Sequence, residues 1–403
     1  MSVSPLQFQR PEHLTQLNSL PPLSLYVHIP WCLRKCPYCD FNSHALPQGS
    51  EAEKLALETR YIDSLITDVE LALPSIWGRR INSIFFGGGT PSLLSPAALD
   101  RLLLALHARL KINPDAEITL EANPGTFEAE RFRAYRASGI NRLSVGIQSF
   151  DAEKLQRLGR VHDGEQARRA LEIAGQHFDN FNVDLMYALP AQSLSQAICD
   201  IETALSFGPT HLSAYHLTLE PNTLFAAQPP ADLPDDELSA DMQQAIEQRL
   251  AQAGFEHYET SAFCLPHHPS RHNLNYWTFG DYLGIGAGAH SKLSFHDKIV
   301  RQMRVKQPQA YLAAIEAGQP VQTDHVIAAD DLAFEFMMNA LRLNHGFTKS
   351  LFHERTGLSI SAILYELDAA QQRGLLTHTA QDIIPTQQGR RFLNDLLAIF
   401  LPD

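Results

Sequence analysis

The sequence predicts an α/β fold, namely a partial (β/α)6 barrel followed by a smaller, mainly helical C-terminal domain. Two observations carry this prediction. Short apolar segments typical of strands alternate with longer segments of helical spacing as far as residue 253. Polar side chains also recur on one face of successive predicted strands, which indicates a sheet that surrounds a ligand.

The predicted strands, in order, are Leu23–Ile29, Ile81–Phe86, Glu117–Glu121, Arg142–Ile147, Phe181–Met186 and His211–Leu217. Each precedes a segment with the apolar spacing of a helix, and these are 52–73, 96–110, 129–138, 164–177, 193–206 and 235–253. Repeated strand–helix units with right-handed crossovers form a parallel sheet that curls toward a barrel.

The chain is predicted to divide into a loosely ordered, Pro-containing segment (1–21), the barrel (22–255) and the C-terminal domain (256–403). The last part begins with an aromatic- and Gly-rich stretch, 276–288, and a predicted helix, 330–342. Helix, helix and short strand signals follow in 351–385, and an amphipathic helix is predicted for 386–401. This order resembles a winged-helix module.

The polar residues fall on one face of four predicted strands, and they are Tyr26 and His28; Thr119 and Glu121; Ser144, Gly146 and Gln148; Asn182 and Asp184. A barrel filled by its own aliphatic side chains would not show this pattern. Any single strand is also explained by a buried polar group with a local partner. Because four strands share the pattern, we expect a polar lumen that holds a ligand.

Charge and composition exclude several classes of protein. The 45 acidic residues outnumber the 32 basic ones, for a net charge of -13, which disfavours binding to nucleic acid. No segment approaches the roughly 18 to 20 apolar residues of a membrane span, and the first residues lack the pattern of a secretion signal. The sequence therefore predicts a cytoplasmic protein with at most peripheral membrane contact.

Three of the five cysteines, Cys32, Cys36 and Cys39, lie directly after the first predicted strand. That position is the C-terminal mouth of the barrel, where this architecture carries its chemistry. Three thiolates on one loop can bind three corners of a cubic iron–sulfur cluster, whose full ligation takes four cysteines. The fourth iron would stay open to a small ligand.

Two other interpretations of these cysteines remain. His44 is a candidate fourth ligand for zinc, although no second ligand pair with zinc-site spacing follows. Cys36 and Cys39, which flank Pro-Tyr, also have the spacing of a redox dithiol, but Cys32 and the position after the first strand argue against it. Cys199 and Cys264 are expected to be structural.

The cysteine spacing after the first strand is similar to that of the radical S-adenosylmethionine (SAM) superfamily. Seven motifs extend the likeness over nearly the whole chain and resemble the heme chaperones of the HemW family, relatives of the oxygen-independent coproporphyrinogen III oxidases. They are Tyr26–Cys32, Cys36–Ser43, Gly87–Pro91, Glu121–Gly125, Ser144–Ser149, Asp184–Pro190 and Arg271–Trp277.

The resemblance implies a 4Fe-4S cluster on Cys32, Cys36 and Cys39, with SAM on Tyr26, Gly88 and Glu121. A second SAM molecule accompanies the first in the oxidases. Its contacts would match Tyr38, Gly89, Thr90, Gln148, Arg160 and Asp184.

Two departures from the oxidases favour the chaperones. Phe41 occupies the position of the oxidases' fourth cysteine, and the motif His272–Trp277 is the one that the chaperones carry. The resemblance then implies heme binding and delivery to respiratory heme proteins, with bacterioferritin and membrane-bound cytochromes as partners. Coproporphyrinogen III oxidation is the alternative function.

An imidazole is a common axial ligand of heme, and a neighbouring cation suits the propionates. His272 with Arg271 is therefore the expected heme site. His267, His268 and His290 are alternative ligands, and a packing corner formed by His272, Tyr276 and Trp277 is the structural alternative.

Overall fold

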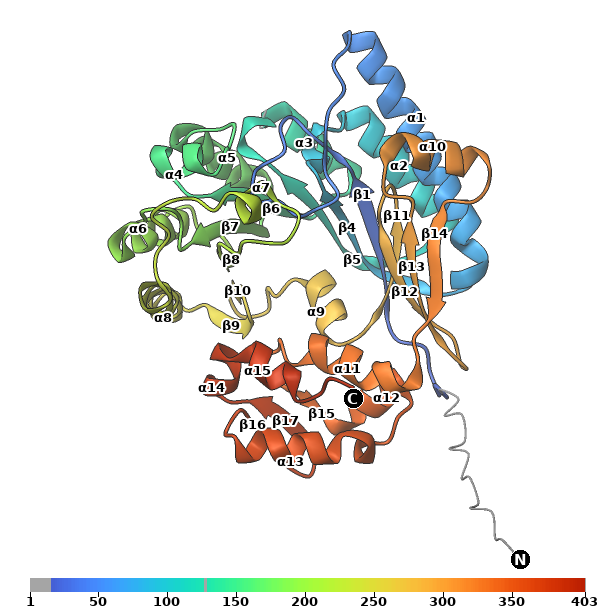
Figure 1. Ribbon diagram of the computed structural model, residues 1–403. Coiled ribbons are helices and arrows are strands. Elements are labelled where there is room, and N and C mark those ends of the chain that lie inside the picture. Colours follow the sequence, from blue (N-terminus) through green and yellow to red (C-terminus); the bar gives the residue numbers. More distant parts are fainter. Residues whose placement is uncertain (1–15, 127–128, 403) are drawn as a thin grey trace, which may run out of the picture.

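The computed structural model describes residues 16–126 and 129–402, and a curved sheet of 12 strands forms its centre (Figure 1). The strand order is β14-β13-β12-β11-β1-β4-β5-β6-β7-β8-β10-β9. Helices cover the outer side of the curve, and the C-terminal module lies at one end of the sheet, beyond α9 (Figure 1). Within the described ranges, no helix is long and apolar enough to span a bilayer.

Six parallel strands in sequence order form the middle of this sheet. They are β1 (Leu23–Ile29), β4 (Arg80–Gly88), β5 (Lys111–Ala122), β6 (Arg142–Gln148), β7 (Phe181–Tyr187) and β8 (His211–His216). The predicted α/β class and partial (β/α)6 barrel are confirmed.

Each of these strands is followed by a long helix on the outer side. These helices are α1 (Glu51–Ala72), α2 (Pro96–Arg109), α3 (Ala129–Ser138), α5 (Gly164–His177), α6 (Leu194–Leu205) and α8 (Asp236–Gln252), with α4 (Ala152–Arg157) and α7 (Leu224–Ala227) as short additions. Side chains that accept from backbone N–H groups fix several of the starts, such as Ser50, Asp163 and Ser193 in capping boxes. Apolar residues of the helices and of the outward sheet face form one continuous core.

Residues 256–326, which the sequence assigned to the C-terminal domain, extend the sheet at both edges. On the β1 side lie β11 (Asp281–Ile285), β12 (His290–Ser294), β13 (Ile299–Arg304) and β14 (Val321–Val326); on the β8 side lie β10 (Ala262–Cys264) and β9 (Glu256–Glu259). Two helices, α9 (Arg271–Trp277) and α10 (Pro308–Glu316), interrupt them. Most of these strands are short and pair antiparallel, so they carry little periodic signal.

The C-terminal module has its own hydrophobic cluster. It contains α11 (Ala329–Ala340), β15 (Phe347–Thr348), α12 (Lys349–Thr356), α13 (Leu364–Gln372), β16 (Leu376–His378), β17 (Asp382–Pro385), α14 (Gln387–Arg391) and α15 (Leu393–Ala398). The single helix predicted for 386–401 is in fact two, because the backbone of Phe392 leaves the helical region at φ -111° and ψ 48°.

Most of the N-terminal segment 1–21, residues 1–15, lies outside the described residues. The described remainder is held more firmly than the sequence suggested. Leu17 is buried in the cluster of the C-terminal module, and its N–H donates to the carbonyl of His296 at 3.0 Å. The apolar side chain of Leu17 explains this ordering, since its burial removes it from water.

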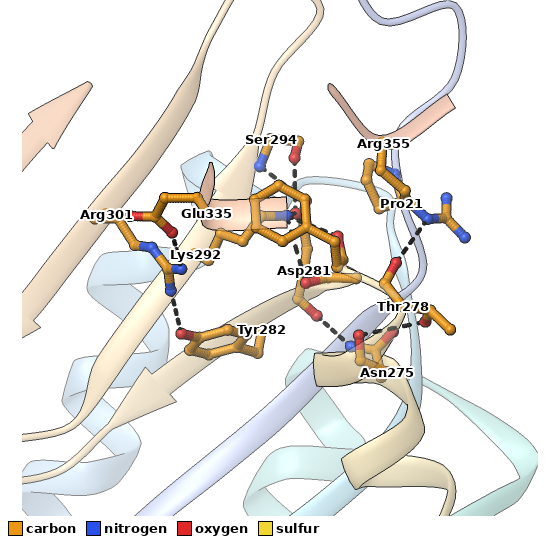
Figure 2. A network of polar contacts seen from close by, with 12 residues as sticks. Pro21, Asn275, Thr278, Asp281, Tyr282, Lys292, Ser294, Arg301, Glu335 and Arg355 are labelled. Carbon is orange, nitrogen blue, oxygen red and sulfur yellow. Dashed lines mark hydrogen bonds and ion pairs between the residues drawn. The ribbon is translucent and has the colours of Figure 1, made fainter. Parts of the chain in front are cut away.

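A buried ionic network lies beside the C-terminal module (Figure 2). Asp281, at the start of β11, accepts hydrogen bonds from Lys292 Nζ at 2.9 Å, from Arg79 Nη1 at 2.7 Å and from Ser294 Oγ at 2.7 Å. Burial alone would raise the pKa of Asp281, but the charges of Lys292 and Arg79 hold it below its usual value. The network thus keeps a buried carboxylate ionised and joins β11, β12 and the segment before β4.

Two further contacts tie the sheet to the module (Figure 2). Arg301 on β13 pairs with Glu335 on α11 and donates to the hydroxyl of Tyr282. Arg355 on α12 donates to the carbonyl of Thr278, directly after α9, at 3.2 Å. The module therefore closes one end of the barrel through fixed polar contacts.

Candidate functional site

Cys32, Cys36 and Cys39 lie on one loop between β1 and α1, and all three thiols are free. Cys32 ends the short strand β2 (Trp31–Cys32), which pairs with β3 (His44–Ala45) and so closes the loop at its base. All three cysteines line the same cavity, of about 380 Å³, at the C-terminal end of the parallel strands. The mouth position predicted from the sequence is therefore the observed one.

The environment of the thiols is partly polar. Arg160 Nη1 donates to the sulfur of Cys36 at 3.7 Å, and the sulfur of Cys39 lies 3.8 Å from Ser43 Oγ. Burial raises the pKa of the Cys32 thiol, the charges of the other two thiols add to this, and a hydrogen bond with Thr90 opposes it. In this environment, binding a cation would favour release of the Cys32 thiol proton.

The donor set fits a cubic cluster. Within the described residues, no three His, Cys, Asp or Glu side chains converge as ligands of a single ion. A cubane does not need such convergence, because each thiolate binds a different iron. His44, the candidate fourth zinc ligand, instead has its Nε2 3.2 Å from Asn42 Oδ1.

The glycine-rich turn at the end of β4 packs against the cysteine loop. Gly88 has a φ of 115°, and a Cβ there would lie 2.5 Å from Cε1 of His28. A Cβ on Gly89 would lie 2.5 Å from the carbonyl oxygen of Trp31. These glycines are therefore required by the close approach of the turn to β1 and β2, in addition to lining the cavity.

Glu121, at the end of β5, faces the same cavity. Its Oε2 accepts a hydrogen bond from the N–H of Gly88 at 3.2 Å. Burial, with a smaller contribution from Asp184, raises the pKa of Glu121 to about 8. A positively charged ligand, such as an amino group, would favour the ionised form of Glu121, because its charge attracts the carboxylate.

The side chain of Arg160 forms part of the wall of this cavity. Its Nη2 donates to Asn123 Oδ1 at 2.6 Å and to the carbonyl of Gly146 at 2.7 Å, while Nη1 reaches the hydroxyl of Tyr38 at 3.5 Å. Gln148, where β6 ends, has a φ of 69°, an uncommon conformation for a residue with a side chain. Such backbone strain is concentrated at ligand sites.

Except for Thr119, the polar residues predicted on the strand faces line two adjoining cavities, the one described above and a second of about 560 Å³ in the lumen. Gly88, Glu121, Ser144, Asp184 and Tyr215 line both. The second cavity extends to α9 and β12 and has aromatic walls, among them Tyr26, Phe85, Tyr276 and Tyr282. The prediction of a polar, open lumen is confirmed.

The structure gathers the predicted residues into two groups. The first cavity is lined by Cys32, Cys36, Cys39, Tyr38, Gly88, Gly89, Thr90, Glu121, Gln148, Arg160 and Asp184. Tyr26 and His272 line the second cavity. Cys199 is exposed and Cys264 is buried on β10, and neither lines these cavities.

His272 is buried, and both of its ring nitrogens have partners. Nδ1 lies 2.9 Å from Ser83 Oγ, and Nε2 lies 2.8 Å from the hydroxyl of Tyr276. Burial, with a smaller contribution from Arg142, lowers the pKa of His272 to about 3, so the ring is neutral. To bind a metal, the imidazole would have to give up one of these hydrogen bonds.

Arg271, expected beside His272 as a partner for propionates, points elsewhere. Its Nη1 donates to the carbonyl of Asp115 at 2.6 Å, and its side chain is half-exposed outside the second cavity. Successive residues of a helix face different directions, which separates the two side chains. Of the alternative histidines, His290 is exposed and lines the second cavity, whereas His267 and His268 do not line it.

The sequence analysis gave no role to several residues that the structure places in the site. Asn123 holds Arg160, and Ser43 approaches Cys39. Both belong to motifs already quoted, so their position there was the available signal. Tyr215 on β8 lines both cavities, and its alternation with His211 and Ser213 was the available signal.

Comparison with known proteins agrees with this geometry. Residues 26–200 match the family model of the radical SAM superfamily, and residues 327–392 match that of the HemN C-terminal domain. The chain is 46% identical to the heme chaperone HemW of Escherichia coli K12, over 95% of this chain and 99% of the relative. It is 33% identical to HemW of Bacillus subtilis, over 94% and 99%.

Among solved structures, it is similar to the coproporphyrinogen III oxidase HemN of Escherichia coli, with a TM-score of 0.79 and 26% identity. This likeness covers 94% of the chain and 90% of the oxidase.

Proposed function

We propose that this chain, which belongs to the HemW family of heme chaperones in the radical SAM superfamily, binds heme and delivers it to heme-requiring respiratory proteins. Bacterioferritin and membrane-bound cytochromes are the proposed acceptors. The cytoplasmic location stays a prediction from the sequence.

The proposed cofactors are a 4Fe-4S cluster and SAM. Cys32, Cys36 and Cys39 would hold the cluster, because three free thiols of one loop open into one cavity. When bound, the cluster would supply an open iron that the amino and carboxylate groups of SAM could chelate. Glu121 would receive the SAM amino group, and the packed turn at Gly88 holds that carboxylate in place.

The proposed second SAM site is the rest of the first cavity. Tyr38, Gly89, Thr90, Gln148, Arg160 and Asp184 would form it. Arg160 is the strongest part of this proposal, because its guanidinium is already fixed by Asn123 and Gly146 and lies at the cavity wall. Measuring how many SAM molecules bind per reconstituted chain tests this proposal, and two are expected if both sites are filled.

One observation carries the heme proposal. The second cavity, of about 560 Å³, is open and walled by aromatic rings, and it adjoins the cluster cavity at Glu121 and Asp184. A planar, largely apolar ligand with charged edges matches a space that combines aromatic walls with buried polar groups. His272 is the proposed axial ligand, and its neutral ring, with Tyr276 as an exchangeable partner, supports that role.

Oxygen-independent coproporphyrinogen III oxidation is the second candidate function. The structural similarity to HemN favours it, as does the cavity beside the proposed SAM site. Phe41 argues against it, because its exposed ring lines the first cavity at the position of the oxidases' fourth cysteine.

Hemin titration of the reconstituted protein tests the heme proposal. A saturable Soret band at one hemin per chain is expected. If hemin gives only the spectrum of the free compound, the proposal fails.

A further inference from the structure

Arg142 is a fully buried cation at the start of β6. Its exposed fraction is 2%, and it lines the second cavity. From the sequence, Arg142 is only the first residue of a predicted strand. In the structure it is the arginine that this cavity buries most completely.

Arg142 differs from the other large buried cations. Arg304 donates to Asp68 at 2.8 Å, Lys292 to Asp281 at 2.9 Å, and Lys154 to the carbonyl of Ala191 at 2.8 Å. In the described part of the chain, Arg142 has neither a hydrogen bond nor an ion pair from its guanidinium, and its Nε is buried without a partner. A buried charge without a partner is costly, so such a group indicates a missing anion.

The sheet places a second unsatisfied group beside it. Thr119 on β5 pairs in register with Arg142, and its hydroxyl oxygen is also buried without a partner in the described chain. Residues opposite each other in a sheet share a face, so both groups are directed to the same side. Two neighbouring polar groups of the sheet are therefore left without a partner in the described chain, and of the two only Arg142 lines the second cavity.

The acceptors around Arg142 are already engaged. Asp184, a buried carboxylate in the same cavity, accepts from Ser144 at 2.9 Å and from Asn182 at 2.7 Å. His211 and His272, whose pKa values burial and the charge of Arg142 both lower, are neutral rings with their own partners. No anion of the protein itself balances the guanidinium at close range within the described residues.

We propose that Arg142 is the receptor for a carboxylate of the ligand in the second cavity. This inference rests on the proposed heme function, under which the carboxylate is a heme propionate. The planar guanidinium can donate two parallel hydrogen bonds to it. Arg142 thereby takes the role that the sequence analysis gave to Arg271, and it lies close enough to His272 to affect that ring's pKa.

The test compares two ligands that differ only at the propionates, hemin and hemin dimethyl ester, on the full-length protein. The parent is expected to bind hemin roughly tenfold more tightly than the ester, the scale of one hydrogen bond to a charged group. Arg142→Met should bind both alike, and Arg142→Lys should keep part of the preference. Arg80→Met, which removes an exposed arginine at the start of β4, should behave as the parent.

Each preference is a ratio of two affinities within one folded variant, so partial unfolding affects both ligands equally. A tenfold preference that persists in Arg142→Met overturns the inference while leaving heme binding intact. If the parent binds neither porphyrin, the proposed function fails and the inference fails with it.

Discussion

The N–H of Gly88 donates a hydrogen bond to the carboxylate of Glu121, with 3.2 Å between the nitrogen and Oε2. This bond links the glycine-rich turn after β4 to the end of β5. It also fixes the position of a carboxyl group whose pKa is raised by burial to about 8. The cavity therefore contains a preformed acceptor for a cationic group. The absence of a Cβ at Gly88 is part of this arrangement, because the turn has no room for one beside His28.

The first prediction concerns stability and pH. Because the pKa of Glu121 is raised from 4.5 to about 8, the folded protein binds more protons than the unfolded chain between these values. The free energy of unfolding should therefore fall as pH rises across this window, by about 1.4 kcal/mol per pH unit from this group. In urea unfolding of the cluster-free protein between about pH 5.5 and 7.5, Glu121→Gln should show a clearly shallower slope. Equal slopes for parent and variant would contradict the raised pKa.

The second prediction concerns SAM. Adding SAM to the reduced, reconstituted protein should change its paramagnetic resonance spectrum, and Glu121→Gln should weaken this change by roughly tenfold in SAM concentration, because a charged acceptor is lost. Iron content should stay at the parent level. Gly88→Val is not an equivalent test, since its side chain would collide with His28 and disturb β1. A Glu121→Gln variant with the parent's SAM dependence would remove Glu121 from the site.

The third prediction concerns the cysteines. Anaerobic reconstitution should give about four irons and four sulfides per chain. Replacing Cys32, Cys36 or Cys39 by Ala should abolish this content, because each would bind a different corner. Cys199→Ala and Cys264→Ala are the controls and should reconstitute normally, since neither residue lines the cavity. One zinc per chain without sulfide would refute the cluster.

The fourth prediction concerns His272. His272→Ala should shift the Soret band of bound hemin and weaken binding. Tyr276→Phe, which removes the partner of Nε2, should bind hemin at least as tightly as the parent, because the imidazole no longer has to break that hydrogen bond. His290→Ala is the matched comparison from the same cavity. An unchanged band in His272→Ala with a shifted band in His290→Ala would transfer the ligand role to His290.

The strands and helices of the barrel could be predicted closely because strand and helix signals alternate regularly along this part of the chain. Leu23–Ile29 and Ala129–Ser138 agree with the structure at both ends. The six strands between residues 256 and 326 that join the main sheet could not, because pairing at a sheet edge depends on partners far away in the chain, as for Leu23 with Asp281. The pattern alone did not indicate that this part of the chain belongs to the sheet.

Some residues of the site could likewise be identified from the sequence, and others could not. Residues in spaced motifs, such as Cys32 and Glu121, were identified because motif and strand end coincide. Arg142 was not, since only the folded arrangement reveals that it lacks a partner. Arg271 does not line the second cavity although its neighbour His272 does, because the two side chains point in different directions from α9.

The most direct test of the central claim measures two activities on one reconstituted sample. Hemin binding is followed by its Soret band, and coproporphyrinogen III conversion is followed in the presence of SAM and a reductant. We expect one bound hemin per chain and no protoporphyrinogen IX above the level of a Cys36→Ala control. Repeated conversion of coproporphyrinogen III without specific hemin binding would contradict it and identify the chain as an oxidase.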